Sequence, residues 1–159
     1  MSDDELRRTN ESIVREYLDA INVWDFAKLR ELLAEDAVFE MVFAPAGFDR
    51  RFEGRESILA FLKTMPALID SENLHDIELD TLHSDPGRIV ATYASEMVIK
   101  TTNLPYTNSY VTRWAVRHGK IEYLGQYYDP IPLVVALGGT VQPAPLEGQG
   151  AGEPRVTRP

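Results

Sequence analysis

The segment Arg88-Ile89-Val90-Ala91-Thr92-Tyr93-Ala94-Ser95-Glu96-Met97-Val98-Ile99-Lys100-Thr101 decides the fold class of this chain. It follows the strong turn signal Asp85-Pro86-Gly87, precedes the turn Asn103-Leu104-Pro105, and predicts a long β-strand. Side chains alternate across a strand, so Glu96 shares one face with four uncharged side chains. A lone carboxylate on a mostly apolar face must be solvated, paired, or held in a pocket where burial raises its pKa. The last case would make Glu96 a catalyst.

More strands lie on both sides of this segment. Residues 76–82 alternate between polar and apolar side chains, and residues 106–117 and 121–129 are separated by the turn His118-Gly119. Residues 37–43 form an earlier apolar run rich in β-favouring side chains. We therefore expect one strand at residues 37–43 and four further strands between residues 76 and 129.

The first part of the chain is helical. Apolar residues recur at helical spacing from Ile13 to Ile21, after the capping box Ser2-Asp3-Asp4-Glu5. Asp25 can cap a second helix that ends near residues 35–36, and Gly54 precedes a third, while residues 133–137 could form a short closing helix. The order α-α-β-α-β-β-β-β predicts an α+β domain in which the N-terminal helices pack on the concave face of a cone-shaped, curved antiparallel sheet.

Composition limits the possible classes of protein. The chain has 159 residues, 44% of them hydrophobic, which is enough for one domain with a core. It has no cysteine and a formal charge of −9, so thiol chemistry is excluded, and nucleic acid and anionic membranes are not expected as partners. The acidic N-terminus does not resemble a signal peptide, and no apolar run is long enough for a membrane helix. We expect a cytoplasmic protein.

A change of composition marks the expected end of the domain. Residues 1–138 carry the helical and strand patterns, whereas residues 139–159 are rich in Gly and Pro and contain little apolar surface to bury. We expect residues 139–159 to be a flexible tail. The alternative is a segment that covers a partner subunit.

The layout resembles the nuclear transport factor 2-like superfamily, in particular its SnoaL-like branch of polyketide cyclases, ketosteroid isomerases, limonene epoxide hydrolases and phenazine-biosynthesis proteins. The resemblance covers roughly residues 8–138 and is carried by four stretches: Arg15-Glu16-Tyr17, Leu32 to Phe39, Phe52 to Ile58, and Gly119 to Pro130. Domains of this type usually pair through the sheet, so the resemblance implies a homodimer.

The resemblance places functional positions on individual residues. Tyr17 falls where ketosteroid isomerases have a tyrosine that stabilises an oxyanion, whereas Met41 and Thr112 replace the acids of that family. Compared with limonene epoxide hydrolases, only Glu96 keeps an acid, because Gln126 and Ala94 stand at the other two positions. No subfamily's complete set of catalytic residues is present.

The candidate catalytic set is therefore Glu96 as acid or base, Gln126 as the group that orients it, and Tyr17 as a hydrogen-bond donor. The expected substrate-binding residues share the inward face: Phe39, Met41, Tyr110, Thr112, Trp114 and Tyr128. Two alternatives stay open. The tyrosines, Phe39 and Trp114 could be ordinary core residues, and Glu96 could lie on a solvated or subunit-facing surface, paired with Arg113 or Lys100.

Metal and nucleotide sites are not indicated. The three histidines lie in separate strands or turns without ligand spacing, and no Gly-rich phosphate-binding loop is present. We expect an enzyme that needs no cofactor and performs acid/base isomerisation, cyclisation or epoxide opening on a hydrophobic polyketide-like or terpenoid-like molecule. The alternative is a non-catalytic module of the same fold that binds a small molecule or mediates dimerisation.

Overall fold

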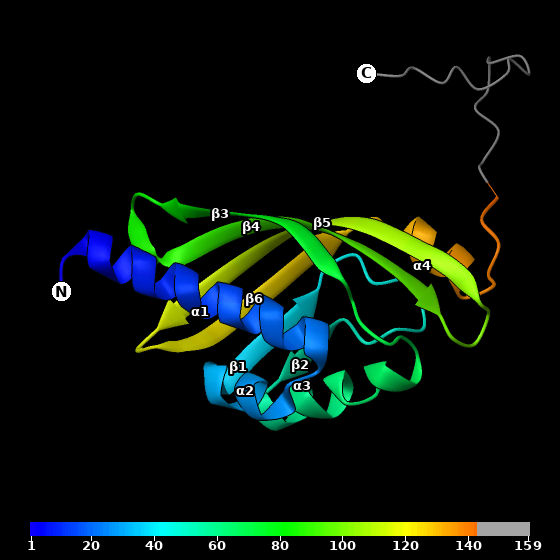
Figure 1. The fold of residues 1–159 in the computed structure, drawn as a ribbon, viewed down its shortest axis with the longest axis horizontal. Coiled ribbons are helices and arrows are strands. Elements are labelled where there is room, and N and C mark those ends of the chain that lie inside the picture. The colour runs from blue at the N-terminus through cyan, green and yellow to red at the C-terminus, as the bar shows by residue number, and fades with distance from the viewer. Residues whose placement is uncertain (143–159) are drawn as a thin grey trace, which may run out of the picture.

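The structure, a computed structural model, describes residues 1–142 and is built on one six-stranded curved sheet (Figure 1). The strands lie side by side in the order β2-β1-β6-β5-β4-β3. Their bounds are β1 Leu33–Met41, β2 Arg51–Glu53, β3 Leu74–Leu82, β4 Asp85–Ile99, β5 Leu104–Arg117 and β6 Lys120–Tyr128. The predicted α+β class and the curved sheet are confirmed.

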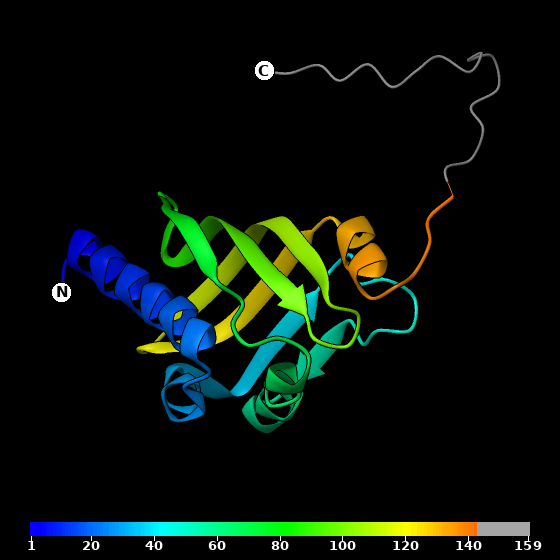
Figure 2. The same ribbon diagram turned by 45° about the vertical axis from the view of Figure 1, so that its right-hand side comes forward.

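Helices cover the inner side of this sheet (Figures 1 and 2). Their bounds are α1 Asp3–Val23, α2 Phe26–Leu32, α3 Arg55–Leu62 and α4 Pro130–Ala136, with a single 3₁₀ turn at Met65–Ala67. The long helix α1 crosses β3 and β4, while α2 and α3 lie near β1 and α4 lies at the far end of β5. The capping box predicted at Ser2 and Glu5 is present and starts α1.

The sheet is mixed, which corrects the prediction of a purely antiparallel one. Strands β3 to β6 are joined by tight turns and pair antiparallel, but β1 pairs with β6 in parallel, with Phe39 opposite Leu124. Antiparallel pairing follows naturally from a hairpin, and no hairpin joins β1 to β6. Residues 42–119 lie between them in the chain, so their relative direction is set by packing alone.

Several boundaries also differ from those predicted, and the first strand spans Leu33–Met41 instead of residues 37–43. The second helix ends at Leu32, because Leu33 already pairs with Ile121 as the first residue of β1. Asp85 to Gly87 belong to β4, and the hairpin turn lies at residues 83–84. Strand β2 was not predicted, since its three residues are held as a strand by pairing to β1 and not by any pattern of their own. The closing helix starts at Pro130, where Asp129 caps it.

The alternation of β4 separates the inside of the fold from the outside. The buried members are Ile89, Ala91, Tyr93, Ser95, Met97 and Ile99. Ile89, Ala91 and Tyr93 form the main core with the buried stripe of α1, where Tyr17 meets Trp114 of β5 edge to face with ring centroids 5.3 Å apart. Met97 and Ile99 belong to a second apolar cluster with Ile69, Tyr106 and Ala136. The other face of β4, which carries Glu96, is turned away from the helices.

Of the predicted tail, residues 143–159 lie outside the described residues. The flexible tail therefore stays a prediction. Residues 139–142 are exposed and have no regular secondary structure.

Candidate functional site

A cavity of about 120 Å³ lies between the inner face of the sheet, α1 and the segment 65–74. Its walls are mainly aromatic and aliphatic. They are formed by Tyr17, Leu18, Ile21, Phe39, Met41, Phe61, Leu62, Met65, Leu68, Ile69, Glu72, Leu74, Tyr93, Met97, Ile99, Tyr106, Tyr110, Leu124, Gln126, Tyr128 and Leu133. A largely apolar hollow with a few converging polar groups is the usual form of a small-molecule site.

Glu72 is the acidic side chain of this cavity, and the sequence analysis did not predict it. It belongs to the irregular segment before β3. The residue as a whole is partly accessible, but burial of the carboxyl group raises its pKa from 4.5 to about 7. No hydrogen bond or ion pair joins this carboxyl to another residue between 1 and 142. A group with such a pKa is present in both protonation states near neutral pH and can give or take a proton.

Several contacts hold the segment that carries Glu72. The side chain of Asn22 accepts a hydrogen bond from the backbone N–H of Leu74 (2.7 Å) and donates one to its carbonyl (3.1 Å). Ser71 Oγ donates to the carbonyl of Asn22 (2.7 Å), and Trp24 Nε1 donates to the carbonyl of Asp70 (2.8 Å). The end of α1 therefore fixes the backbone on both sides of Glu72.

Lys100 holds the same segment from the end of β4. Its Nζ lies 2.6 Å from a carboxylate oxygen of Asp70 and 2.7 Å from the carbonyl of Pro66, and its backbone N–H donates to the carbonyl of Leu68. The positive charge of Lys100 is thus used on the outer side of the segment, opposite the side on which Glu72 enters the cavity.

Tyr17 and Tyr93 are two of the cavity tyrosines whose pKa is raised by the charge of Glu72. Burial raises the pKa of Tyr17, and the neighbouring Tyr93 and Glu72 raise it further. Burial also raises the pKa of Tyr93, followed by the charge of Glu72, while the side chains of Thr112 and Gln126 act in the opposite direction. Both hydroxyls therefore stay protonated at neutral pH and act as hydrogen-bond donors. No residue within 1–142 is hydrogen-bonded to the Tyr17 hydroxyl, so that hydroxyl can serve a ligand.

Tyr106 and Tyr110 use their hydroxyls within the protein. Tyr110 Oη lies 3.0 Å from Ser95 Oγ and 3.2 Å from Tyr106 Oη. Tyr106 Oη accepts a hydrogen bond from Asn108 Nδ2 (2.9 Å). The ring of Tyr110 stacks on Tyr93 with centroids 5.2 Å apart. These two tyrosines line the cavity mainly as aromatic surface.

The structure places most of the predicted site residues around the cavity. Tyr17, Phe39, Met41, Tyr110, Gln126 and Tyr128 all line it. Thr112 and Trp114 point inward as predicted but lie beneath the wall, where Trp114 Nε1 donates to Thr112 Oγ1 (2.8 Å) and Thr112 donates to the carbonyl of Ala91. These two residues are part of the core.

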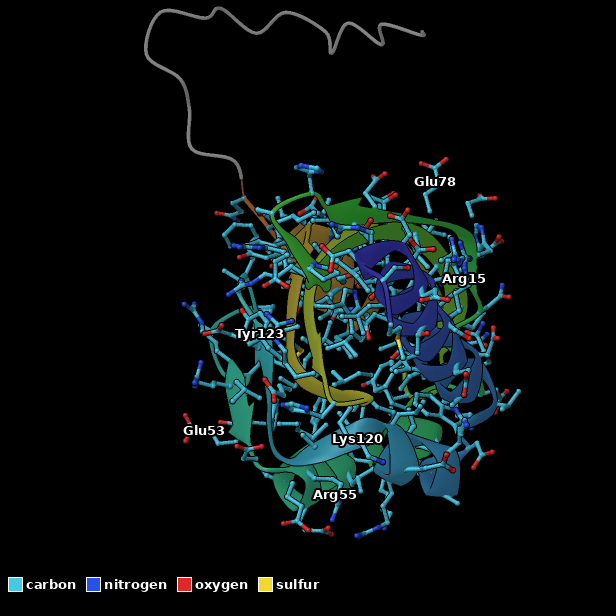
Figure 3. The ribbon with its side chains drawn as sticks, turned by 90° about the vertical axis from the view of Figure 1, so that its left-hand side faces the viewer. Arg15, Glu53, Arg55, Glu78, Lys120 and Tyr123 are labelled. Carbon is cyan, nitrogen blue, oxygen red and sulfur yellow. The ribbon has the colours of Figure 1, made fainter. Side chains whose placement is uncertain are left out.

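The expectation that Glu96 faces the interior is corrected. Glu96 is exposed on the outer face of β4, and the cavity is lined from this strand by Tyr93, Met97 and Ile99. An ionised carboxylate is far more stable in water than in an apolar interior, and this favours the observed register. Among residues 1–142, Glu96 makes no ion pair with Arg113 or Lys100, since Lys100 is paired with Asp70. Figure 3 shows two other acids, Glu53 and Glu78, projecting outward in the same way.

Of the cavity residues that were not predicted, some lie in a recognisable sequence pattern and others do not. Tyr93 could have been found by choosing the other face of the β4 segment, on which bulkier side chains alternate. Tyr106 lies on the same inner face of β5 as Tyr110. Glu72 had no signal, because Asp70 and Glu72 are both acids in an irregular segment and only tertiary packing separates their surroundings.

No group of three or more His, Asp or Glu side chains within residues 1–142 is arranged to hold a metal ion. Within the same range, no helix is both long and apolar enough to cross a membrane.

Known proteins share this sequence pattern and this fold. The SnoaL-like domain model matches residues 14–124. The uncharacterised protein YesE of Bacillus subtilis is 30% identical over 118 residues, which are 73% of this chain and 78% of YesE.

Solved structures agree in fold. An isomerase candidate from Bacillus subtilis has 26% identity and a TM-score of 0.78, with 88% of this chain and 98% of that chain covered. A polyketide cyclase candidate from Xanthomonas campestris has 24% identity and a TM-score of 0.73, with 83% and 98% covered. The nuclear transport factor 2-like fold is thus shown, and the chain belongs to the SnoaL-like domain family.

Proposed function

We propose that this protein is a cofactor-independent acid/base enzyme that acts on a hydrophobic, polyketide-like or terpenoid-like small molecule, with Glu72 in the role first expected for Glu96. The observation that carries the proposal is the position of one unpartnered carboxyl group with a pKa of about 7 inside an apolar cavity. Enzymes commonly adjust a carboxyl to this range by burial when it must transfer protons near neutral pH.

The reaction class that suits these groups is proton transfer next to a carbonyl. The Glu72 carboxylate removes a proton from the carbon beside the carbonyl, and the C–H electron pair forms a C=C bond while negative charge develops on the oxygen. The Tyr17 hydroxyl donates a hydrogen bond to that oxygen in a site with little water. Protonated Glu72 then returns the proton to another carbon of the conjugated enolate, which completes an isomerisation. In a cyclisation, the enolate carbon instead attacks a second carbonyl carbon of the same molecule, the C=O π electrons move onto that oxygen, and the oxygen takes the proton from Glu72.

The size of the cavity limits the part of the substrate that can be enclosed. A cavity of roughly 150 Å³ in another protein takes up one benzene ring. The cavity here, at about 120 Å³, is of similar size. We therefore expect about one ring, or a chain of similar volume, to lie next to Glu72 and Tyr17, with any larger part of the substrate outside.

A carbon-acid probe tests this function. The probe is 2-tetralone in deuterated buffer, and NMR measures deuterium exchange at the carbons beside its carbonyl. Glu72→Gln should slow the protein-catalysed exchange by about 10²-fold to 10⁴-fold, because general acid/base catalysis typically contributes that much. Glu96→Gln is the matched control, since Glu96 is exposed on the outer face, and it should exchange at the wild-type rate. Exchange at the wild-type rate in Glu72→Gln would end the proposal.

A non-catalytic binding module is the second candidate. This candidate is favoured because Met41 and Gln126, which line the cavity, carry no group that can transfer a proton. Glu72 is then the single acid in the cavity wall formed by residues 1–142. In this case small molecules that co-purify with the protein, identified by mass spectrometry, would be recovered chemically unchanged after incubation with fresh protein.

A further inference from the structure

The residues around Glu72 indicate which charge a ligand of the cavity should carry. The lining of the cavity contains one carboxyl and no Lys, Arg or His. Lys100, the base that holds the neighbouring backbone, is 2.6 Å from Asp70 on the outer side of the segment. Buried carboxylates in proteins are normally paired with a positive group, and this one has no such partner among residues 1–142.

Aromatic rings, most of them tyrosines, form part of the remaining cavity wall beside Leu, Ile and Met side chains. Five tyrosines face it from four elements: Tyr17 from α1, Tyr93 from β4, Tyr106 and Tyr110 from β5, and Tyr128 from β6. Burial raises the pKa of every one of them, so they stay neutral, and Glu72 is the only wall group that changes charge near pH 7. The faces of aromatic rings carry partial negative charge and attract cations, most strongly where water is excluded.

We propose that the cavity selects a small organic cation, a hydrophobic ammonium compound whose positive charge pairs with the Glu72 carboxylate and contacts the surrounding tyrosine rings. The ligand would supply the positive partner that residues 1–142 do not provide. Carboxylates and phosphates of the same size would be rejected, because they would meet a like charge and no basic group. The formal charge of −9 on the whole chain adds a long-range attraction for cations.

This inference narrows the substrate of the proposed enzyme to molecules that carry an ammonium group beside their hydrophobic part, and it rests on the proposed function and the same cavity. It concerns affinity, whereas the proposed function concerns turnover, so each can fail while the other holds. An ammonium group near Glu72 would also favour the ionised carboxylate and lower the pKa of Glu72 when the ligand binds.

Three molecules of nearly equal shape test the selection: choline, its uncharged carbon analogue 3,3-dimethylbutan-1-ol, and the anion 3,3-dimethylbutanoate. Isothermal titration calorimetry measures their affinities for the full-length protein at pH 8, where Glu72 is ionised, and at pH 6. We expect choline to bind at least tenfold more tightly than the alcohol at pH 8, a smaller preference at pH 6, and no binding of the anion at either pH.

Two variants separate the role of Glu72 from general hydrophobic binding. Glu72→Gln should remove most of the preference for choline while the alcohol binds as before, and Glu96→Gln should leave all affinities unchanged. Equal affinity for choline and the alcohol at pH 8, no binding of choline at millimolar concentration, or a full preference retained in Glu72→Gln would each overturn the proposal. None of these results depends on whether the protein exchanges the protons of 2-tetralone.

Discussion

An ionised carboxyl group without a partner destabilises the folded chain that contains it, and Glu72 is such a group. Its pKa of about 7 lies well above the value of 4.5 for an exposed glutamate. Between these two pH values, the Glu72 carboxyl is therefore mostly protonated in the folded state and mostly ionised in the unfolded state. Stability from this group is fully present below pH 4.5 and is lost as the pH rises toward 7.

Removing the charge should reverse this loss. We expect Glu72→Gln to unfold at the same temperature as the wild type at pH 5, or slightly lower, and at a higher temperature at pH 8. The gain at pH 8 should approach about 3 kcal/mol, since each pKa unit corresponds to about 1.4 kcal/mol. Thermal unfolding followed by circular dichroism at both pH values measures it. A variant that is no more stable than the wild type at pH 8 would show that Glu72 has an ordinary pKa.

Tyr17 and Tyr110 differ in what their hydroxyls contact, and their Phe variants should differ accordingly. Tyr17→Phe removes a hydroxyl that has no hydrogen-bond partner between residues 1 and 142, so it should leave stability nearly unchanged and slow exchange of 2-tetralone about tenfold or more. Tyr110→Phe removes contacts with Ser95 and Tyr106 and should cost about 1 kcal/mol of stability. Chemical denaturation and the exchange assay check both. An equal loss of stability in the two variants would contradict this distinction.

At the residue scale, six of the predicted site residues line the cavity, but they are a minority of its wall and do not include its acid. Tyr17, Phe39 and Tyr128 were predicted from helical or strand periodicity combined with the family resemblance, and they line the cavity. Glu96 was assigned to the wrong face, because both faces of β4 are largely apolar and alternation alone does not say which is buried. Glu72 lies in an irregular segment, where no periodicity exists to predict which way a side chain points.

The segment 65–74 is the element on which the site depends most. It forms one wall of the cavity through Met65, Leu68, Ile69, Glu72 and Leu74. It has almost no secondary structure of its own, and its position follows from hydrogen bonds to the end of α1 and to Lys100. Sequence patterns predicted α1 and the strands, whereas this segment could not be placed because its contacts come from distant parts of the chain.

Asn22 links α1 to this segment, and its removal should disturb the site. We expect Asn22→Ala to lose about 1 to 3 kcal/mol of stability, because the backbone N–H and carbonyl of Leu74 lose their partner. If Asn22 positions Glu72, the variant should also move the midpoint of the pH profile of 2-tetralone exchange. Ser12→Ala, on the exposed side of the same helix, is the control and should change neither quantity. An unchanged pH midpoint in Asn22→Ala would limit Asn22 to a structural role.

At the scale of the whole molecule, we expect two copies of the protein to contact each other through the outer face of the sheet. This face exposes Val111, which lies opposite Tyr127 of β6, and it exposes Val98 six positions further along β4, with relative exposures of 47% and 51%. In Figure 3, Tyr123 marks the β6 part of the sheet's outer surface, on the side away from α1. Exposed apolar side chains on a sheet face are a common feature of interaction surfaces.

We expect the wild-type protein to be a dimer at micromolar concentration and Val111→Glu to be a monomer, because two like charges would meet in a symmetric interface. Multi-angle light scattering measures the mass. Val23→Glu, at the exposed end of α1, should remain dimeric. A monomeric wild type would contradict the pairing through the sheet, and a dimeric Val111→Glu would place the interface elsewhere.

The parallel pairing of β1 with β6 has a consequence for how this protein is made. A ribosome adds residues from the N-terminus onward, so β1 is synthesised some 80 residues before the strand against which it lies. Until β6 has been synthesised, the edge of β1 that pairs with it has no neighbouring strand, and the cavity lacks both Gln126 and Tyr128. Nascent chains that stop just short of residue 120 should therefore be unable to hold a ligand, even though α1, α2, α3 and the antiparallel strands β3, β4 and β5 are already complete.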